Sequence, residues 1–215
     1  MADPANFIRE NTRIAAPPLV PEIELHLATE ITPLWHATEE TLERHQLPPP
    51  FWAFPWAGGQ ALARFVLDHR ELIAGKRVLD IGAGSGLVAI AAAKAGARDV
   101  TAADIDLFAI EAIGLNAAHN NVAIAAESRD VIGISESLWD AVLVGDMCYE
   151  RPLAERLTNW LRVLAHNGAV VLLGDPGRAY LPKQGLREMA RYTVPTSLEL
   201  EDRTSRETII WQLVP

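Results

Sequence analysis

The chain is short of cysteine, of cationic clusters and of long apolar runs, and each shortage excludes a class of protein. Its 215 residues include one cysteine, Cys148, so no internal disulfide can form, and no Cys/His cluster has zinc-ligand spacing. No stretch approaches the roughly 18 unbroken apolar residues of a membrane span. The N-terminal segment shows neither a secretory signal nor an arginine-rich transit peptide. We therefore expect a cytoplasmic protein with no metal site and no membrane partner.

The charge balance argues against nucleic acid as the main partner. The sequence has 19 Lys and Arg against 28 Asp and Glu, a net charge of −9, and no block of basic residues. Nucleic acids and anionic membranes are held chiefly through their negative charge, which an acidic chain repels. The hydrophobic fraction of 49% suits one domain with a sizeable core. We expect a monomer in which residues 51–215 form this domain and residues 1–50 pack on it as an extension.

From residue 76 onward, short β-rich runs alternate with helical patterns, which is typical of an α/β protein with a parallel sheet covered on both faces. The predicted strands are 76–81, 99–104, 122–127, 139–145 and 168–174. The predicted helices are 86–95, 106–120, 151–165 and 183–191. Further helices are expected near 32–45 and from GGQALARFVLDHRELI. The extended segments YTVPTSLELE and ETIIWQLVP, separated by DRTSR, would close the sheet as an antiparallel hairpin.

The strongest chemical signal is VLDIGAGSGLVAI, residues 78–90. An apolar strand runs into Gly82, Gly84 and Gly86 and then into a helix, whose first N–H groups lack partners within the helix. Glycines allow a ligand to approach the backbone closely, and they suit a turn that requires positive φ. The spacing G-x-G-x-G places Leu87 where the dinucleotide fingerprint has its last glycine. A nicotinamide or flavin cofactor is therefore disfavoured.

Two carboxylates make the glycine loop more specific. Asp80 lies two residues before the first glycine, where it would meet a cationic ligand. Asp104 ends the next strand, about 20 residues on, from where a carboxylate accepts hydrogen bonds from both hydroxyls of a ribose. Together they describe a nucleoside that lacks phosphate and carries positive charge, and S-adenosylmethionine fits this description.

DIGAGSG followed by AADID resembles the first two motifs of the class I S-adenosylmethionine-dependent methyltransferases. The resemblance implies a seven-stranded, Rossmann-like sheet with helices on both faces and an antiparallel last strand. It also implies that the methionine end of the cofactor lies along Asp80, Gly82, Gly84 and Gly86, and that Asp104 holds the ribose.

Three further segments, FWAFPWAGGQAL, WDAVLVGDMCYE and LLGDPGR, resemble the family-16 protein methyltransferases, in particular the lysine methyltransferases of the electron-transfer-flavoprotein β subunit. The resemblance implies that Trp56 borders the cofactor and that Asp146 and Tyr149 lie beside the target lysine of that β subunit. By the class I resemblance Asp130, after the third strand, would lie near the adenine. The alternative is that Asp130 only caps the helix or loop that follows it.

A second resemblance competes with the first. GSGLVAIAAAKAGA, ADID and NAAHNNV are similar to the bacterial methyltransferases of a large-subunit ribosomal protein. That family has Asn-Ile-Leu after the fourth strand, where this chain has Asp146, Met147 and Cys148, and it has a substrate-recruiting domain for which the residues before 50 are too few. Methylation of the flavoprotein is therefore the preferred interpretation. A ribosomal-protein or small-molecule methyltransferase and a non-catalytic S-adenosylmethionine-binding module are the alternatives.

Asp146 and Tyr149 are the predicted catalytic residues. A lysine with a pKa of about 10.4 is neutral in less than about one molecule in a thousand at pH 7, a cost of roughly 4–5 kcal/mol. Burial beside a sulfonium lowers that pKa, while Asp146 and the Tyr149 hydroxyl orient the amine or pass its proton to water. We expect Asp146 to orient the amine rather than to act as a base. The alternatives are that Asp146 caps the helix at 151–165 and that Tyr149 only packs.

Asp175 and Arg178 follow the next strand, on the rim where open α/β sheets bind ligands. They either contact the protein substrate or brace their own loop. The aromatic residues of FWAFPW resemble a base-stacking platform, but no basic residues surround them, so a lid over the cofactor pocket is the preferred interpretation.

Overall fold

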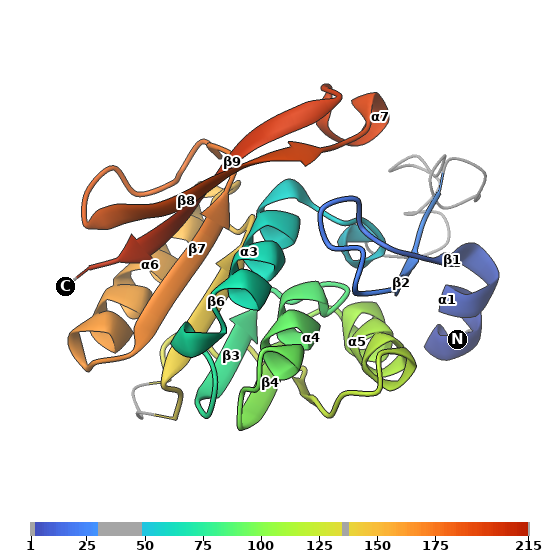
Figure 1. Ribbon diagram of the computed structural model, residues 1–215, viewed down its shortest axis with the longest axis horizontal. Helices are drawn as coiled ribbons and strands as arrows, with labels where there is room; N and C mark the ends of the chain where they lie inside the picture. The colour runs from blue at the N-terminus through green and yellow to red at the C-terminus, as the bar shows by residue number, and fades with distance from the viewer. Residues whose placement is uncertain (1–2, 30–48, 135–137, 215) are drawn as a thin grey trace.

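The computed structural model describes residues 3–29, 49–134 and 138–214, and its centre is a seven-stranded sheet (Figure 1). The strands lie in the order β5-β4-β3-β6-β7-β9-β8. Their bounds are β3 Arg77–Ile81, β4 Asp99–Ala103, β5 Ala125–Glu127, β6 Ala141–Gly145, β7 Val170–Asp175, β8 Leu186–Pro195 and β9 Ser205–Leu213. Within this sheet β9 runs antiparallel to both of its neighbours, and the other pairs are parallel. The predicted strands and the antiparallel last strand are confirmed.

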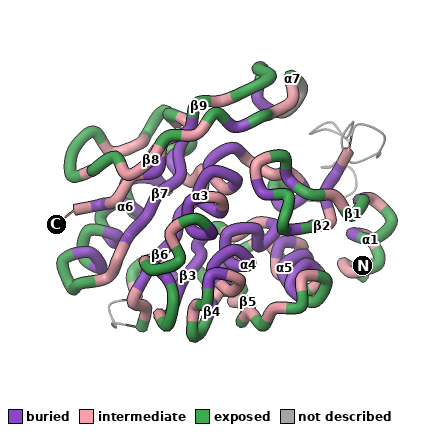
Figure 2. The backbone as a smooth tube through the Cα atoms, in the orientation of Figure 1, coloured by how far each residue is buried: buried purple, intermediate pink, exposed green. Residues whose placement is uncertain are grey.

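Helices cover both faces of this sheet. The described helical segments are α1 Pro4–Asn11, η1 Phe51–Ala53, α3 Ala57–Asp68, η2 Arg70–Leu72, α4 Leu87–Lys94, α5 Leu107–His119, α6 Arg151–His166 and α7 Leu198–Glu201. Side chains of a strand alternate between faces, so Val78 of β3 joins the core beneath α3 and α4, whereas Leu79 and Ile81 join the core beneath α6. Figure 2 shows buried backbone concentrated in the central strands and in α3 and α4.

The predicted helix at 183–191 is wrong, because Leu186–Pro195 form the edge strand β8. Leu186, Met189 and Ala190 recur at a helical spacing, but pairing with β9 supplies the backbone hydrogen bonds of a strand instead. The β-branched residues Thr193 and Val194 also favour that strand, and tertiary pairing overrides a weak helical pattern. The predicted hairpin is confirmed, although its first segment starts earlier than expected and its end forms α7.

The described part of residues 1–50 lies against α5. The short strands β1, Arg13–Ala15, and β2, Leu25–Leu27, pair antiparallel beside α1 (Figure 1). Asn116 of α5 joins this segment to the glycine loop: its side chain accepts a hydrogen bond from the backbone N–H of His26 at 2.8 Å and donates one to the carbonyl of Ser85 at 2.8 Å. The helix predicted near 32–45 lies outside the described residues.

Candidate active site

A cavity of about 540 Å³ lies at the carboxyl ends of β3, β4 and β6. Open α/β sheets bind ligands at this rim. Most of the predicted site residues line this cavity, namely Trp56, Gly82, Gly84, Asp104, Asp130, Asp146, Tyr149 and Arg178. Asp80, Gly86 and Asp175 were predicted for the same site, but they lie behind its wall.

The glycine loop forms one side of the cavity through its backbone. Gly82, Gly84 and Gly86 have φ values of 63°, 52° and 81°, a region that side chains disfavour, so the predicted need for glycine is confirmed. Asp104 closes the loop: one carboxylate oxygen accepts a hydrogen bond from the N–H of Gly84 at 2.9 Å, and the other accepts from that of Asp106 at 3.0 Å. Gly86 caps the start of α4 instead of lining the cavity.

Asp80 lies beneath this loop and is 1% exposed. Its carboxylate accepts a hydrogen bond at 2.9 Å from the N–H of Ala89, in the first turn of α4. Burial raises the pKa of Asp80 to about 8, and the Asp104 carboxylate contributes to the rise. Asp80 therefore supports the loop from behind, and its expected contact with a cationic ligand stays a prediction.

The N-terminus of α3 approaches the ends of β6 and β7 so closely that only glycine fits. A Cβ atom on Gly58 would lie 2.2 Å from the carbonyl oxygen of Gly174 and 2.5 Å from a carboxylate oxygen of Asp146. A Cβ atom on Gly145 would lie 3.1 Å from the Cα of Gly59. The sequence resemblance placed Trp56 of WAGG at the border of the cofactor and gave no packing reason for the two glycines that follow. The available signal was the Gly-Asp pair that recurs at the ends of both strands, in GDMCYE and GDPGR.

Asp146 occupies this junction with a left-handed backbone, at φ 57°. Its N–H donates to the carbonyl of Gly174 at 3.1 Å, which continues the pairing of β6 with β7. One carboxylate oxygen accepts from the N–H of Gly59 in the first turn of α3, at 3.1 Å. Asp146 therefore caps α3 and not α6. The capping role proposed for α6 is wrong, because the N-cap of that helix is Glu150, which makes no side-chain cap.

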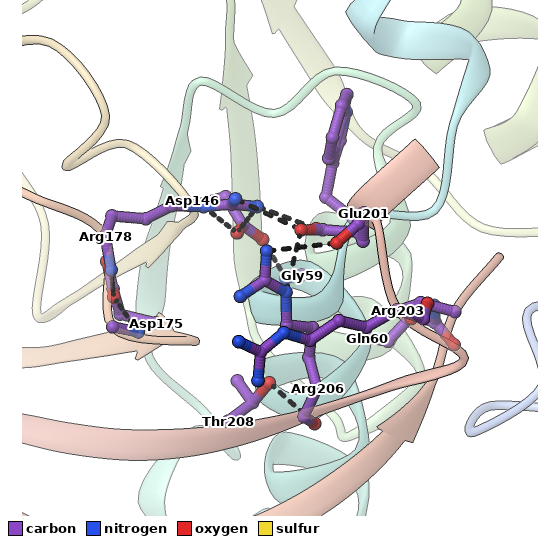
Figure 3. Close-up of polar contacts among 12 residues, drawn as sticks. Gly59, Gln60, Asp146, Asp175, Arg178, Glu201, Arg203, Arg206 and Thr208 are labelled. Carbon is purple, nitrogen blue, oxygen red and sulfur yellow. Dashed lines mark hydrogen bonds and ion pairs between the residues drawn. The ribbon is translucent and has the colours of Figure 1, made fainter. Parts of the chain in front are cut away.

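The other carboxylate oxygen of Asp146 pairs with Arg178, whose Nε and Nη2 donate at 3.0 and 2.6 Å (Figure 3). Burial raises the pKa of Asp146 to about 6, although the attraction of Arg178 opposes the rise. The nearby carboxylates of Asp175 and Glu201 contribute to the same rise. A pKa near 6 leaves the Asp146 carboxylate ionised at neutral pH.

Arg178 is held from several sides and also lies 5.8 Å over the ring of Trp56. Its Nη2 donates to Glu201 at 2.8 Å, in addition to the bond with Asp146. Asp175 accepts from the N–H groups of Gly177 and Arg178, both at 2.7 Å. Asp175 thus braces its own loop, as one of the two alternatives expected, whereas Arg178 reaches the cavity.

Tyr149 lies at the edge of the cavity and is 51% exposed. Its ring lies 6.3 Å from that of Phe51, so it packs against another aromatic residue of the wall. Burial, with the carboxylates of Glu150 and Asp104, raises the pKa of the Tyr149 hydroxyl. The hydroxyl is therefore protonated at neutral pH and can donate a hydrogen bond.

Asp130 turns its own loop and lines the cavity, while its expected place near the adenine stays a prediction. One carboxylate oxygen accepts from the N–H of Ile132 at 3.0 Å, which turns the loop after β5, and the other pairs with Arg156. Asp130 also lines the cavity.

Within the described ranges, no group of three or more His, Cys, Asp or Glu side chains is arranged to hold a metal ion. No helix of this part of the chain is long and apolar enough to cross a membrane.

Comparison with known proteins assigns the family. The model of the ribosomal protein L11 methyltransferase family (PrmA) matches residues 61–174. The electron transfer flavoprotein beta subunit lysine methyltransferase of Danio rerio is 39% identical over 217 residues, covering 98% of this chain and 83% of that protein. This chain belongs to the electron transfer flavoprotein β-subunit lysine methyltransferase family. The sequence-based assignment to protein-lysine methyltransferases is confirmed.

The ribosomal resemblance covers less of both proteins. The ribosomal protein L11 methyltransferase of Laribacter hongkongensis is 35% identical over 152 residues, which cover 67% of this chain and 48% of that enzyme. Among solved structures, magnesium protoporphyrin IX methyltransferase from Synechocystis PCC 6803 with bound S-adenosylmethionine has a TM-score of 0.55 at 20% identity, covering 74% of this chain and 80% of that one. This structural likeness confirms the class I methyltransferase fold.

Proposed function

We propose that this lysine methyltransferase transfers methyl groups from S-adenosylmethionine to lysine side chains of the electron-transfer-flavoprotein β subunit. Membership of the family supports the activity, and the names of its nearly full-length relatives support the substrate. The structural observation on which the proposal rests is that Asp104, the expected ribose ligand, and Asp146, the expected lysine ligand, line one cavity. One cavity would then hold both reactants, which methyl transfer requires.

The cavity fits the cofactor in size and chemistry. Its volume of about 540 Å³ lies within the usual range of small-molecule sites. The backbone of Gly82 and Gly84 would border the methionine end, Asp104 the ribose and Asp130 the adenine, with the indole of Trp56 on the cavity wall. When bound, S-adenosylmethionine supplies a methyl group on a sulfonium, which makes that carbon electrophilic.

Asp146 and Tyr149 would hold the amine of the substrate lysine. Asp146 is already paired with Arg178, so the charge of the carboxylate that it offers to the amine is balanced by the guanidinium. An unpaired carboxylate would raise the pKa of the lysine and favour its unreactive ammonium form, whereas a neutralised one orients the amine with less of that effect. The protonated hydroxyl of Tyr149 would form a second hydrogen bond with the lysine amine. The lysine nitrogen would take up the methyl group that S-adenosylmethionine supplies as the demethylated thioether leaves, and the proton of the amine would go to water.

The direct test is transfer of radiolabelled methyl groups to candidate proteins. The purified enzyme is incubated with labelled S-adenosylmethionine and either the flavoprotein β subunit or a ribosomal protein of the large subunit. We expect label on lysines of the β subunit. Label on the ribosomal protein alone would overturn the proposed substrate, and cofactor binding without transfer to any protein would favour the non-catalytic module.

An Asp146→Asn variant tests the proposed role of Asp146. Asparagine keeps an oxygen that accepts from the N–H of Gly59, but it removes the negative charge. We expect this variant to bind S-adenosylmethionine with unchanged affinity in calorimetry but to lose turnover. If it lost cofactor affinity as severely as an Asp104→Ala variant, Asp146 would belong to the cofactor side of the cavity and its proposed role would be wrong.

A further inference from the structure

A second buried carboxylate, Glu201, lies behind the cavity wall. It belongs to α7, in the connection between β8 and β9, it is 3% exposed, and it does not line the cavity. Its Oε1 lies 2.8 Å from Nη2 of Arg178, and its Oε2 lies 3.2 Å from Nη1 of Arg178 and 3.2 Å from Nε of Arg206 (Figure 3). Buried carboxylates are costly without such counterions, because burial removes their hydration.

Arg178 connects this carboxylate to the candidate active site. Its Nε and Nη2 donate to Asp146, and its Nη1 and Nη2 donate to Glu201, so the guanidinium bridges the two acids. A guanidinium is a rigid, planar fork, and fixing one of its edges fixes the direction of the other. The orientation of Arg178 toward Asp146 is therefore set together with its contact to Glu201.

The remaining contacts of Asp146 do not replace this constraint. Its second oxygen accepts from the N–H of Gly59, and its backbone N–H donates to Gly174. Without Glu201, the long side chain of Arg178 would regain rotamer freedom at the cavity edge. Arg206, on β9, holds Glu201 from the far side, and its Nη2 also donates to the Glu201 carbonyl at 3.1 Å. Arg206, Glu201 and Arg178 thereby connect the C-terminal hairpin to the cavity.

We propose that Glu201 is a positioning residue of the methyltransferase, which locks Arg178 against Asp146 and so fixes the carboxylate that meets the substrate amine. This proposal rests on the proposed function for the part of Asp146 in catalysis. It adds a residue outside the cavity to the groups on which turnover depends.

The test compares two charge-removing substitutions on the same hairpin. Glu201→Gln keeps the shape of the side chain, and Glu207→Gln, which removes the exposed ion pair between Glu207 and Arg191, is the matched control. We expect Glu201→Gln to lower kcat on the flavoprotein β subunit by about 10-fold or more, the usual effect of losing a charged hydrogen bond. The calorimetric Kd for S-adenosylmethionine should stay unchanged. The control should alter neither quantity, and an unchanged kcat in Glu201→Gln would overturn the proposal.

A double-mutant cycle separates positioning from general destabilisation. Lysine in Arg178→Lys lacks the planar fork by which arginine is held against both carboxylates at once, so Glu201→Gln should reduce kcat far less in that background than in the wild type. Fully additive losses would show that Glu201 does not act through Arg178.

A crystal structure of Glu201→Gln supplies a readout that needs no substrate. We expect the guanidinium of Arg178 to have left the position in which its Nε and Nη2 both contact Asp146. If both contacts persisted, the proposal would be wrong whichever protein the enzyme methylates. Failure of the proposed function would be seen separately, as absence of label on the flavoprotein β subunit with the wild-type enzyme.

Discussion

Replacing Gly58 with alanine tests how α3 is joined to the sheet beside the candidate active site. The added Cβ would lie 2.2 Å from the backbone oxygen of Gly174 and 2.5 Å from the carboxylate of Asp146. A backbone oxygen cannot rotate away, so the first turn of α3 must move off the ends of β6 and β7. That movement breaks the hydrogen bond from Gly59 to Asp146.

The expected cost follows from these contacts. Overpacking of a filled interior costs about 1–3 kcal/mol. Loss of a hydrogen bond to a charged group costs about 1.5–3 kcal/mol. The helix propensity of alanine returns about 0.5–1 kcal/mol. We therefore expect Gly58→Ala to lower the free energy of unfolding by about 2–5 kcal/mol, which in a domain of this size lowers Tm by about 5–20 °C.

Gly59→Ala is the matched control for this substitution. It adds the same methyl group to the next residue of the same helix, but its Cβ would meet no atom within 4 Å. Only the gain in helix propensity applies, so Tm should stay the same or rise by a few degrees, about 2–4 °C for each kcal/mol. Thermal and urea unfolding of both variants measure the difference. Equal shifts in Tm would show that α3 and the strand ends are not packed as described.

Three further substitutions test the cofactor side of the cavity. Asp104→Ala should weaken S-adenosylmethionine binding in calorimetry by about 10-fold or more, because it removes both the proposed ribose ligand and the acceptor for the glycine loop. Unchanged affinity would contradict the proposed role of Asp104. Asn116→Ala should also weaken cofactor binding and should lower stability by about 1–3 kcal/mol, because Ser85 and His26 each lose a buried partner. Asp80 should make unfolding pH-dependent: its folded pKa of about 8 lies above the ordinary 3.8, so its contribution is present at low pH and is lost as pH rises toward 8. The loss is at most roughly 1.4 kcal/mol for each pH unit, and Asp80→Asn should remove it from urea unfolding measured between pH 5 and 8.

The parts of the fold that could be predicted from the sequence depend on local patterns. The strand, the glycine loop and the start of the next helix follow one another directly in the sequence. The residue pattern of 78–90 therefore predicts all three. Asp104 follows the next parallel strand, and the carboxyl ends of parallel strands meet at one edge, so its place beside the loop also follows. The conformations of Gly82, Gly84 and Gly86 agree with this local argument.

The contacts around Arg178 could not be predicted in the same way. Its partners Asp146 and Glu201 are 32 and 23 residues away in sequence, and each contact depends on strand pairing. The incorrect helix at 183–191 concealed the register of β8 and β9, which brings α7 and its buried carboxylate to Arg178. Glu201 was expected at the end of the extended segment YTVPTSLELE, and no partner for its carboxylate was predicted.

The position of Asp146 limits what a loss of activity can prove about its role. Capping of a helix and contact with a substrate looked like alternatives when the helix in question was α6. In the structure Asp146 caps α3 with one oxygen and pairs with Arg178 through the other, so the capping of a helix does not exclude the proposed contact with the substrate amine. Asp146→Ala leaves the N–H of Gly59 without its acceptor, which costs about 1–3 kcal/mol, and removes a counterion of Arg178. We expect it to lower Tm by about 2–12 °C. Asp146→Asn keeps the acceptor for Gly59 but turns an amide NH2 toward Arg178 in place of the carboxylate, so its Tm should fall by less than that of Asp146→Ala. Only if turnover is lost in the asparagine variant at a temperature well below its Tm, where α3 stays anchored, does the loss belong to the substrate amine.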